Sequence, residues 1–241
     1  MRTWAYLLYC LIGQTLAFAT PTSVFWTNCT TDVQPFGTAH IGVDNYFSMG
    51  NRAKNGSSFP VDIGLQGGFF SYCGIAAEAG VDYLGGVFDP MLFNGKIGIE
   101  EGKLCADAPS FSIGMFNIGT TRATNFCIVD AVIGHTLPKN LGTLYAGVYR
   151  GKRALGEKRA GWMVAYQKPF CTCTDAKGTS FAKWQLNADY ASGKNAIGGG
   201  GVAVQYFFTP QISIETGPVW FTNTSLNGRW KWSLQLDITL P

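Results

Sequence analysis

Two histidines, His40 and His135, are the side chains of this sequence suited to acid–base chemistry near neutral pH. No local motif sets a nucleophilic serine or cysteine beside either of them, and His135 falls at a predicted strand end, where an exposed structural histidine is common. The glycine run Gly198–Gly201 lies inside a predicted strand with no helix after it, unlike a phosphate-binding loop. The sequence therefore predicts no enzyme, no cofactor and no bound metal.

Six cysteines after the N-terminal segment are candidates for disulfide bonds, because an even number of cysteines in an exported chain is typical of disulfides. The sequence does not select a pairing among them. Cys171 and Cys173 are separated by one residue, which is too short for the usual zinc and haem motifs, and both fall in a long turn predicted over residues 169–180. The candidates are Cys29, Cys73, Cys105, Cys127, Cys171 and Cys173.

The other candidates are polar and charged side chains that occupy every second position of otherwise apolar segments. They share one face of each segment, so any site that they form must lie on that face. Acidic members are common in the early segments, whereas the basic members Lys183, Arg229 and Lys231 come late in the chain. The full set is Asp62, Gln66, Glu78, Asp82, Lys96, Glu100, Lys183, Gln185, Asn187, Asp189, Glu215, Arg229, Lys231 and Asp237.

The elements that position these side chains are predicted to be β-strands. From Trp230 to Leu240 apolar and polar residues alternate without interruption, and the same period of two recurs along the chain. No segment carries a helical stripe, so the predicted fold class is all-β. About twelve strands are predicted, near residues 38–49, 60–70, 74–85, 90–100, 110–118, 126–136, 143–151, 159–168, 180–191, 199–208, 211–222 and 229–240.

The composition excludes several other classes of protein. The 241 residues are 46% hydrophobic and only 14% charged, and 31 of them are glycine. A disordered chain would be less hydrophobic and more highly charged, and a polytopic helical membrane protein would need further apolar runs of about 18 residues beyond the N-terminus. The formal net charge of +3 is too small to indicate a nucleic-acid partner. No linker divides the strands into separate domains.

Residues 1–19 have the form of a cleaved export signal. Arg2 supplies a positive start, the stretch from Trp4 to Leu16 is largely apolar, and Ala17-Phe18-Ala19 fits the small-x-small cleavage pattern. We therefore expect the mature chain to begin at Thr20.

Alternation alone fits both a soluble sandwich and a membrane barrel, and three features favour a barrel over residues 38–241. The predicted strands are about 10–12 residues long, near the length that crosses a bilayer with tilt. Aromatic residues such as Tyr46, Phe69 and Trp220 gather at strand ends, as they do at membrane interfaces. The strands also form a plain series of hairpins in an even number. We predict a closed antiparallel transmembrane up-and-down β-barrel of about twelve strands, with a soluble secreted β-protein as the alternative.

Four segments carry a resemblance to a known family. They are Val24–Pro35 (VFWTNCTTDVQP), His40–Phe47 (HIGVDNYF), Gly80–Gly86 (GVDYLGG) and Asp189–Asn195 (DYASGKN). Over nearly its whole mature length the chain resembles a poorly characterised family of Gram-negative outer-membrane β-barrel proteins. The resemblance implies an outer-membrane location and a porin-like shape, and it brings no substrate or catalytic residues.

In such a barrel the polar faces of the strands form the wall of the lumen, so the polar set given above is expected to line it. Residues 20–37 are too irregular for a strand and are a candidate plug of the lumen. The main hypothesis is a narrow, low-specificity channel for small hydrophilic solutes. The alternative is a non-conducting structural or adhesion barrel, in which interior ion pairs only stabilise the fold.

Alternation also predicts which loops lie outside the cell if both termini are periplasmic. The loop around residues 151–159 carries Lys152, Arg153, Lys158 and Arg159. It fits a solvated hairpin tip, a contact with anionic lipopolysaccharide, or a cationic mouth that attracts anionic solutes. The expected partners are outer-membrane lipids, lipopolysaccharide, small hydrophilic solutes and the barrel-assembly machinery. The predicted outer loops fall near residues 50–59, 86–89, 119–125, 152–158, 192–198 and 223–228.

Overall fold

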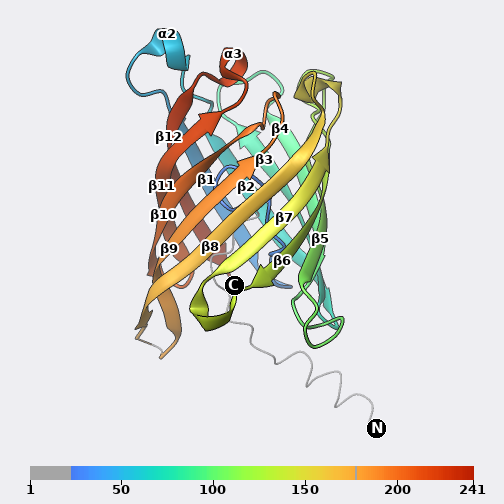
Figure 1. Ribbon diagram of the computed structural model, residues 1–241, viewed down its shortest axis with the longest axis vertical. Helices are drawn as coiled ribbons and strands as arrows, with labels where there is room; N and C mark the ends of the chain where they lie inside the picture. The colour runs from blue at the N-terminus through green and yellow to red at the C-terminus, as the bar shows by residue number, and fades with distance from the viewer. Residues whose placement is uncertain (1–22, 177) are drawn as a thin grey trace.

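The structure, a computed structural model, describes residues 23–176 and 178–241. Its strands close into a single antiparallel barrel in which neighbours in sequence pair with each other and β1 pairs with β12 (Figure 1). The strands are β1 Ala39–Phe47, β2 Asp62–Tyr72, β3 Ile75–Leu84, β4 Met91–Ile99, β5 Ser110–Gly119, β6 Ile128–Thr136, β7 Thr143–Arg150, β8 Ala160–Thr174, β9 Ser180–Ala191, β10 Gly199–Thr209, β11 Ile212–Phe221 and β12 Trp230–Leu240. The predicted closed, up-and-down barrel of about twelve strands is confirmed.

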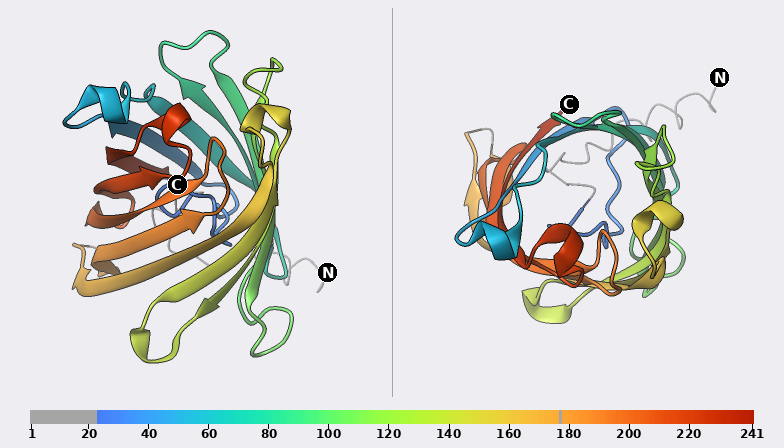
Figure 2. Two further views of the ribbon diagram at one scale, coloured as in Figure 1. Left: turned by 45° about the horizontal axis from the view of Figure 1, so that its top comes forward. Right: turned by 90° about the horizontal axis from the view of Figure 1, so that it is seen from above.

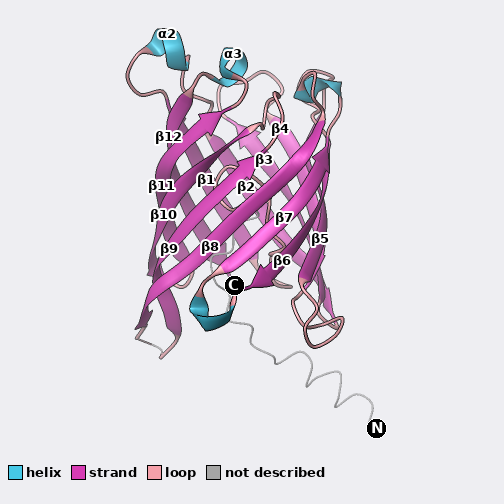
Figure 3. Cartoon of the chain, viewed as in Figure 1, coloured by secondary structure: helices cyan, strands magenta, loops and turns pink. Residues whose placement is uncertain are grey.

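The predicted export signal, residues 1–19, and the expected mature start at Thr20 lie outside the described residues. Short helical turns lie in the loops at the two ends of the barrel. One end carries α2 Arg52–Asn55 and α3 Thr224–Asn227 (Figure 3). In the described parts of the chain, no helix is both long and apolar enough to cross a bilayer.

The alternation along β12 shows how the sequence produces the two surfaces of the barrel. Lys231, Gln235 and Asp237 are buried and point inward, whereas Trp232 and Leu234 on the opposite face are each 38% exposed. This arrangement is the reverse of a soluble sandwich, which buries its apolar face and wets its polar one. Apolar side chains are likewise exposed along the other strands, for example Ile97, Ile113, Ile133, Val148, Val164 and Val204.

The long turn predicted over residues 169–180 is wrong. β8 continues to Thr174 and β9 begins at Ser180, so only a short turn joins them. The extra residues stay in the sheet because Thr172 and Cys173 pair with Ala182 and Phe181 of β9. Pro169 and the Cys-x-Cys spacing resemble a loop in the sequence, but the ladder accommodates both.

Residues 23–37 lie inside the barrel rather than in its wall. Seen from above, this segment crosses the interior of the ring of strands (Figure 2). It forms no strand, and its one pairing with the wall is an isolated bridge between Phe36 and Gly68. Val24, Phe25 and Cys29 are almost completely buried, so the segment supplies much of the apolar filling of the lumen.

The barrel lumen as candidate functional site

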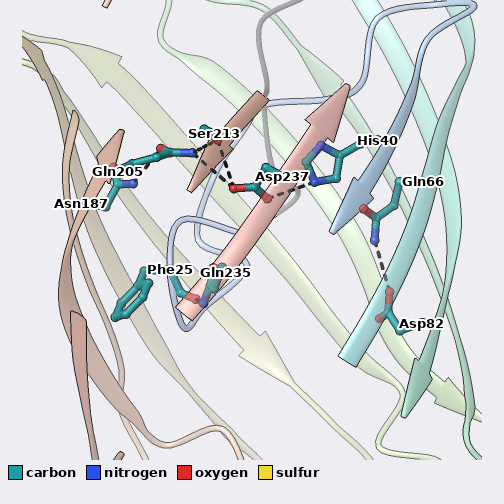
Figure 4. Close-up of polar contacts among 9 residues, drawn as sticks. All are labelled: Phe25, His40, Gln66, Asp82, Asn187, Gln205, Ser213, Gln235 and Asp237. Carbon is teal, nitrogen blue, oxygen red and sulfur yellow. Dashed lines mark hydrogen bonds and ion pairs between the residues drawn. The ribbon is translucent and has the colours of Figure 1, made fainter. Parts of the chain in front are cut away.

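A connected polar network covers one wall of the lumen, on β9, β10, β11 and β12 (Figure 4). Nδ2 of Asn187 donates to Oε1 of Gln205 at 3.2 Å and to Oε1 of Glu215 at 2.8 Å. Nε2 of Gln205 in turn donates to Oγ of Ser213 at 2.9 Å. Because most of these polar atoms pair with one another, this wall offers few free hydrogen-bonding atoms to a solute; Oε2 of Glu215 is one that has no partner in the described chain.

Asp237 joins this wall to β1. Its Oδ2 accepts a hydrogen bond from Oγ of Ser213 at 3.3 Å, and its Oδ1 lies 3.2 Å from Nε2 of His40. The carboxylate therefore stands between the imidazole and the hydroxyl. In a nucleophilic triad the imidazole stands between the serine and the carboxylate, so this arrangement does not place His40 to accept a proton from Ser213.

The second histidine lies at the end of the barrel opposite α2 and α3. Nδ1 of His135 is 2.6 Å from Oε1 of Glu101, and the amide of Thr136 donates to the same carboxylate at 3.0 Å. Hydrogen bonds from Thr136 are the main cause that lowers the pKa of Glu101, and the nearby His135 lowers this pKa further. This exposed pair attaches the β4–β5 loop to the end of β6.

The opposite wall of the lumen contains separate acidic contacts. Nδ2 of Asn94 donates to Asp82 at 2.6 Å. Nε2 of Gln66 donates to the same carboxylate at 3.3 Å (Figure 4). Deeper in the wall, Glu78 and Lys96 form a buried ion pair with an N–O distance of 3.7 Å.

Asp189 holds the first part of the lumenal segment. Its Oδ2 accepts hydrogen bonds from three successive amides, those of Phe25 at 3.1 Å, Trp26 at 2.8 Å and Thr27 at 2.7 Å. The hydroxyl of Thr27 donates to the same oxygen at 3.1 Å. Consecutive amides that converge on one anion form a nest, and a buried carboxylate needs such donors to offset its desolvation.

Further contacts hold the rest of the segment against the other strands. Oε2 of Glu78 accepts the amide of Gln34 at 2.6 Å, and the hydroxyls of Thr31 and Ser110 lie 2.7 Å apart. A Cβ atom at Gly68 would come within 2.2 Å of the carbonyl of Pro35, so a glycine is required where the segment passes this strand. Residues 23–37 are thus attached to both walls of the lumen.

The glycine run near β10 has a packing role. A Cβ atom at Gly201 would lie 2.5 Å from the ring of Phe25, and one at Gly198 would overlap the carbonyl of Gly193. Side chains at these positions would push the lumenal segment and the adjoining loop away from the wall. The run therefore permits a close approach of backbones.

Beside the lumenal segment the lumen contains a cavity of about 430 Å³. It extends from the level of His40 and Asp237 up to residues of the end loops, including Ala196 and Leu226. The lining is polar on the side of β1, β2, β3 and β6, and aromatic where Trp26 approaches the wall. A space of this size can hold a small organic solute.

Most of the predicted lumen residues do point inward or are buried in the structure. Two do not line the lumen: Glu100 follows the end of β4 and Arg229 precedes the start of β12, and both are exposed. The alternating pattern was extended past the ends of these strands. Lys183 is partly buried near the start of β9, with Nζ 4.6 Å from the ring centre of Tyr206. The inward or buried members are Asp62, Gln66, Glu78, Asp82, Lys96, Gln185, Asn187, Asp189, Glu215, Lys231 and Asp237.

The sequence prediction missed several lumen residues that the structure brings together. They share the inward positions of strands that were predicted correctly, so extending the period of two to every strand would have found most of them. No pattern within a strand could have found the contacts of residues 23–37, because these join distant positions, 44 residues apart for Gln34 and Glu78 and 163 for Trp26 and Asp189. The missed residues are His40, Asp44, Asn94, Ser112, Asp130, Gln205, Ser213 and Gln235.

Lys231 shows how a basic residue is accommodated at the rim of this lumen. Its Nζ donates to the carbonyls of Asn55 at 2.9 Å and Ser57 at 2.8 Å, and lies 4.4 Å from the ring centre of Phe59. Arg229 is exposed, and Lys183 contacts the ring of Tyr206. The three basic residues that come late in the chain therefore do not form a basic wall of the lumen.

The six described cysteines are unpaired in the structure. They are scattered: Cys73 and Cys105 lie in turns and are exposed, Cys127 precedes β6, and Cys29 is fully buried beside the lumen wall. Burial, reinforced by nearby aspartates, raises the pKa of the Cys29 thiol. Cys171 is exposed and Cys173 is partly exposed on the extended end of β8.

The basic residues of the loop between β7 and β8 lie at the end of the barrel that carries α2 and α3. Lys152, Arg153, Lys158 and Arg159, here called the basic rim loop, are all exposed. The loop is held in place by the buried side chain of Leu155 and by a hydrogen bond from the amide of Ala196 to the Leu155 carbonyl at 2.9 Å. The four charges are thus presented to the surroundings from a fixed backbone.

No protein-family model and no curated protein matches the sequence. Among solved structures, an outer membrane channel from Pseudomonas putida F1 is similar, with 11% identity, 87% of this chain and 98% of that chain covered, and a TM-score of 0.48. The NanC porin is similar with 9% identity, 83% and 99% covered, and a TM-score of 0.48. Similarities of this degree concern shape and indicate no substrate. The family suggested by the sequence remains a prediction.

Proposed function

We propose that this protein is an outer-membrane β-barrel that acts as a narrow channel for small hydrophilic solutes. The observation that carries the proposal is the inverted burial of the strands, with exposed Trp232 and Leu234 outside and buried Gln235 and Asp237 inside. Only a lipid environment makes an apolar exterior of this extent favourable, and only a closed barrel satisfies the backbone of strands in lipid. The cavity inside the lumen supports passage of small solutes.

The test is single-channel recording of the folded protein in a planar bilayer. We expect discrete conductance steps that are small compared with those of an open sixteen-stranded porin, because the barrel is narrower and residues 23–37 occupy part of its lumen. Folding is checked first by heat-modifiable mobility in an electrophoresis gel. Folded protein that inserts without any conductance step would contradict the channel, and recovery in the soluble fraction without detergent would contradict the membrane barrel.

A second candidate is a non-conducting structural barrel, and one observation favours it. Residues 23–37 are hydrogen-bonded to Asp189 on one wall and to Glu78 on the other, so they form a plug if they stay attached. Recording the Asp189→Ala variant beside the natural protein separates the two candidates. A conductance that appears only in the variant would identify a plugged barrel, and equal steps in both proteins would favour a channel that conducts beside the segment.

We also propose that the basic rim loop contacts phosphate groups of the outer leaflet. Four exposed cations on a fixed loop, at the end of the barrel that also carries α2 and α3 (Figure 1), are suited to anionic headgroups such as those of lipopolysaccharide. This interpretation places the end with α2 and α3 outside the cell.

A further inference from the structure

The cavity in the lumen is lined by more carboxylates than basic side chains. Asp44, Asp62, Asp82, Asp130 and Asp237 all border it, and its described lining contains neither lysine nor arginine. Asp44 stands directly opposite Asp62 in the pairing of β1 with β2. Like charges placed opposite each other across two strands destabilise a sheet, so this arrangement favours a positively charged occupant.

Unpaired hydrogen-bond acceptors point to the same kind of occupant. His40, which is 2% exposed and borders the cavity, contacts Asp237 through Nε2, while its Nδ1 has no hydrogen-bond partner among the described residues. In the tautomer in which Nε2 donates to Asp237, Nδ1 is an acceptor. Oδ1 of Asp62 also lacks a partner in the described chain. Buried polar atoms are nearly always hydrogen-bonded, so these two atoms require a donor.

Aromatic rings complete the lining. Trp26, Tyr46 and Phe59 border the cavity, and the ring centres of Trp26 and Tyr46 are 5.4 Å apart in an edge-to-face arrangement. Aromatic faces attract ammonium groups and also pack against methylene chains. Phe59 already has such a contact with Nζ of Lys231, 4.4 Å from its ring centre.

We propose that this cavity binds a linear organic polycation of the aliphatic diamine or polyamine class. Four of the carboxylates gather on the neighbouring strands β12, β1, β2 and β3, and Asp130 lies apart from them on β6. Two separate anionic regions suit ammonium groups that are joined by a methylene chain, and the aromatic rings fit those methylenes. Ammonium groups are also donors for the free acceptors of His40 and Asp62. The proposal deepens the channel function and rests on it only for the route by which the ligand enters.

Calorimetric titration of spermidine into the full mature protein, folded in detergent micelles, tests this inference. We expect saturable binding of spermidine and no binding of 1,8-octanediol, which has a comparable apolar chain without charge. Asp44→Asn and Asp62→Asn should each weaken spermidine binding at least tenfold. Both variants should fold, because each removes one of two opposed like charges, and heat-modifiable mobility verifies it.

Asp107→Asn is the matched control, since Asp107 is an exposed carboxylate in the β4–β5 loop, away from the cavity. Its spermidine affinity should equal that of the natural protein. Absence of spermidine binding to the natural protein, or equal weakening by Asp107→Asn and Asp44→Asn, would overturn the proposal. Because the titration needs no bilayer, spermidine binding by a barrel that passes no current would support the cavity site while contradicting the channel.

Discussion

Asp189 shows at the scale of one residue how the lumen is organised. Its carboxylate accepts three backbone amides and one hydroxyl from residues 25–27. Asp189→Ala leaves these buried donors without their charged acceptor, so we expect the free energy of unfolding to fall by about 2–4 kcal/mol. Urea unfolding in lipid vesicles measures this change. Asp189→Asn keeps one neutral acceptor oxygen, so its free energy of unfolding should fall by less than that of Asp189→Ala.

The thiol of Cys29 reports whether the segment is released in that variant. Cys29 is fully buried and its pKa is raised by burial, so it should resist maleimide in the natural protein, whereas the exposed Cys73 should react. If Asp189 holds the segment, Cys29 should become reactive in Asp189→Ala while Cys73 reacts as before. If Cys29 stays protected from maleimide in Asp189→Ala, the remaining contacts are sufficient to hold the segment in the lumen, and Asp189 is not required for this.

Glu101 gives a prediction about pH. Its pKa is lowered by hydrogen bonds from Thr136 and by His135, so the carboxylate stabilises the fold above the pKa of the unfolded chain and loses this effect as the pH falls through its lowered pKa in the folded state. At pH 7 we expect Glu101→Gln to be less stable by under about 1 kcal/mol, since the pair is largely exposed. Thermal unfolding from pH 7 to pH 3 should show this difference disappear. A difference that is constant with pH would contradict the assignment.

At the scale of single residues, the sequence predicted the inward orientation of side chains well. It predicted poorly which of these side chains contact one another. Gln205 and Asp237 occupy inward positions that alternation identifies, but their hydrogen bond at 3.4 Å depends on the stagger between β10 and β12. Alternation carries no information about stagger between strands. Glu100 and Arg229 were misplaced for a related reason, since a periodic pattern does not show where a strand ends.

The strands themselves were predictable because their two faces differ. Along β5 and β12 the side chains on the outer face are mostly apolar and those on the lumen face are mostly polar or small, and this difference gives the sequence its period of two. The extended end of β8 was missed because Pro169 and Cys171 are atypical of strands. In the structure Pro169 pairs with Gln185 of β9, and Cys171 lies between two residues that also pair with β9. The irregular segment 23–37 has no such period.

The two faces of a strand lead to a prediction about β5. Ile113 lies in the middle of this strand, faces outward and is 46% exposed. If it contacts lipid, Ile113→Arg should destabilise the folded barrel by about 2–4 kcal/mol, as a charge does near the centre of a bilayer. The measurement is urea unfolding of the refolded protein in vesicles.

Leu104→Arg provides the control for this substitution. Leu104 is 68% exposed in the β4–β5 loop, outside the strands, so arginine there should change the free energy of unfolding by no more than about 0.5 kcal/mol. Equal effects of the two substitutions would contradict a lipid-facing exterior, since in water both arginines would be solvated.

Over the whole molecule, charge is separated in a way that the net value of +3 conceals. The lumen is acidic, with Asp44, Asp62 and Asp130 among its lining residues, while the basic rim loop lies at one end of the barrel. The sequence contains all of these charges, but their separation depends on barrel closure and on which loops share an end. If the barrel lies in an asymmetric membrane, as proposed, the same separation of charge gives it an orientation.

The proposed orientation can be tested by measuring whether the basic rim loop binds lipopolysaccharide. If its four cations contact phosphate groups, lipopolysaccharide should raise the thermal unfolding temperature of the detergent-folded protein more than its dephosphorylated form does. Replacing all four residues by Gln should remove that phosphate-dependent increase, whereas Lys103→Gln with Lys139→Gln, at the opposite end, should retain it. The increase should also shrink as salt is raised, because exposed charges are screened. An equal increase in all three proteins would show that the basic rim loop is only a solvated hairpin tip.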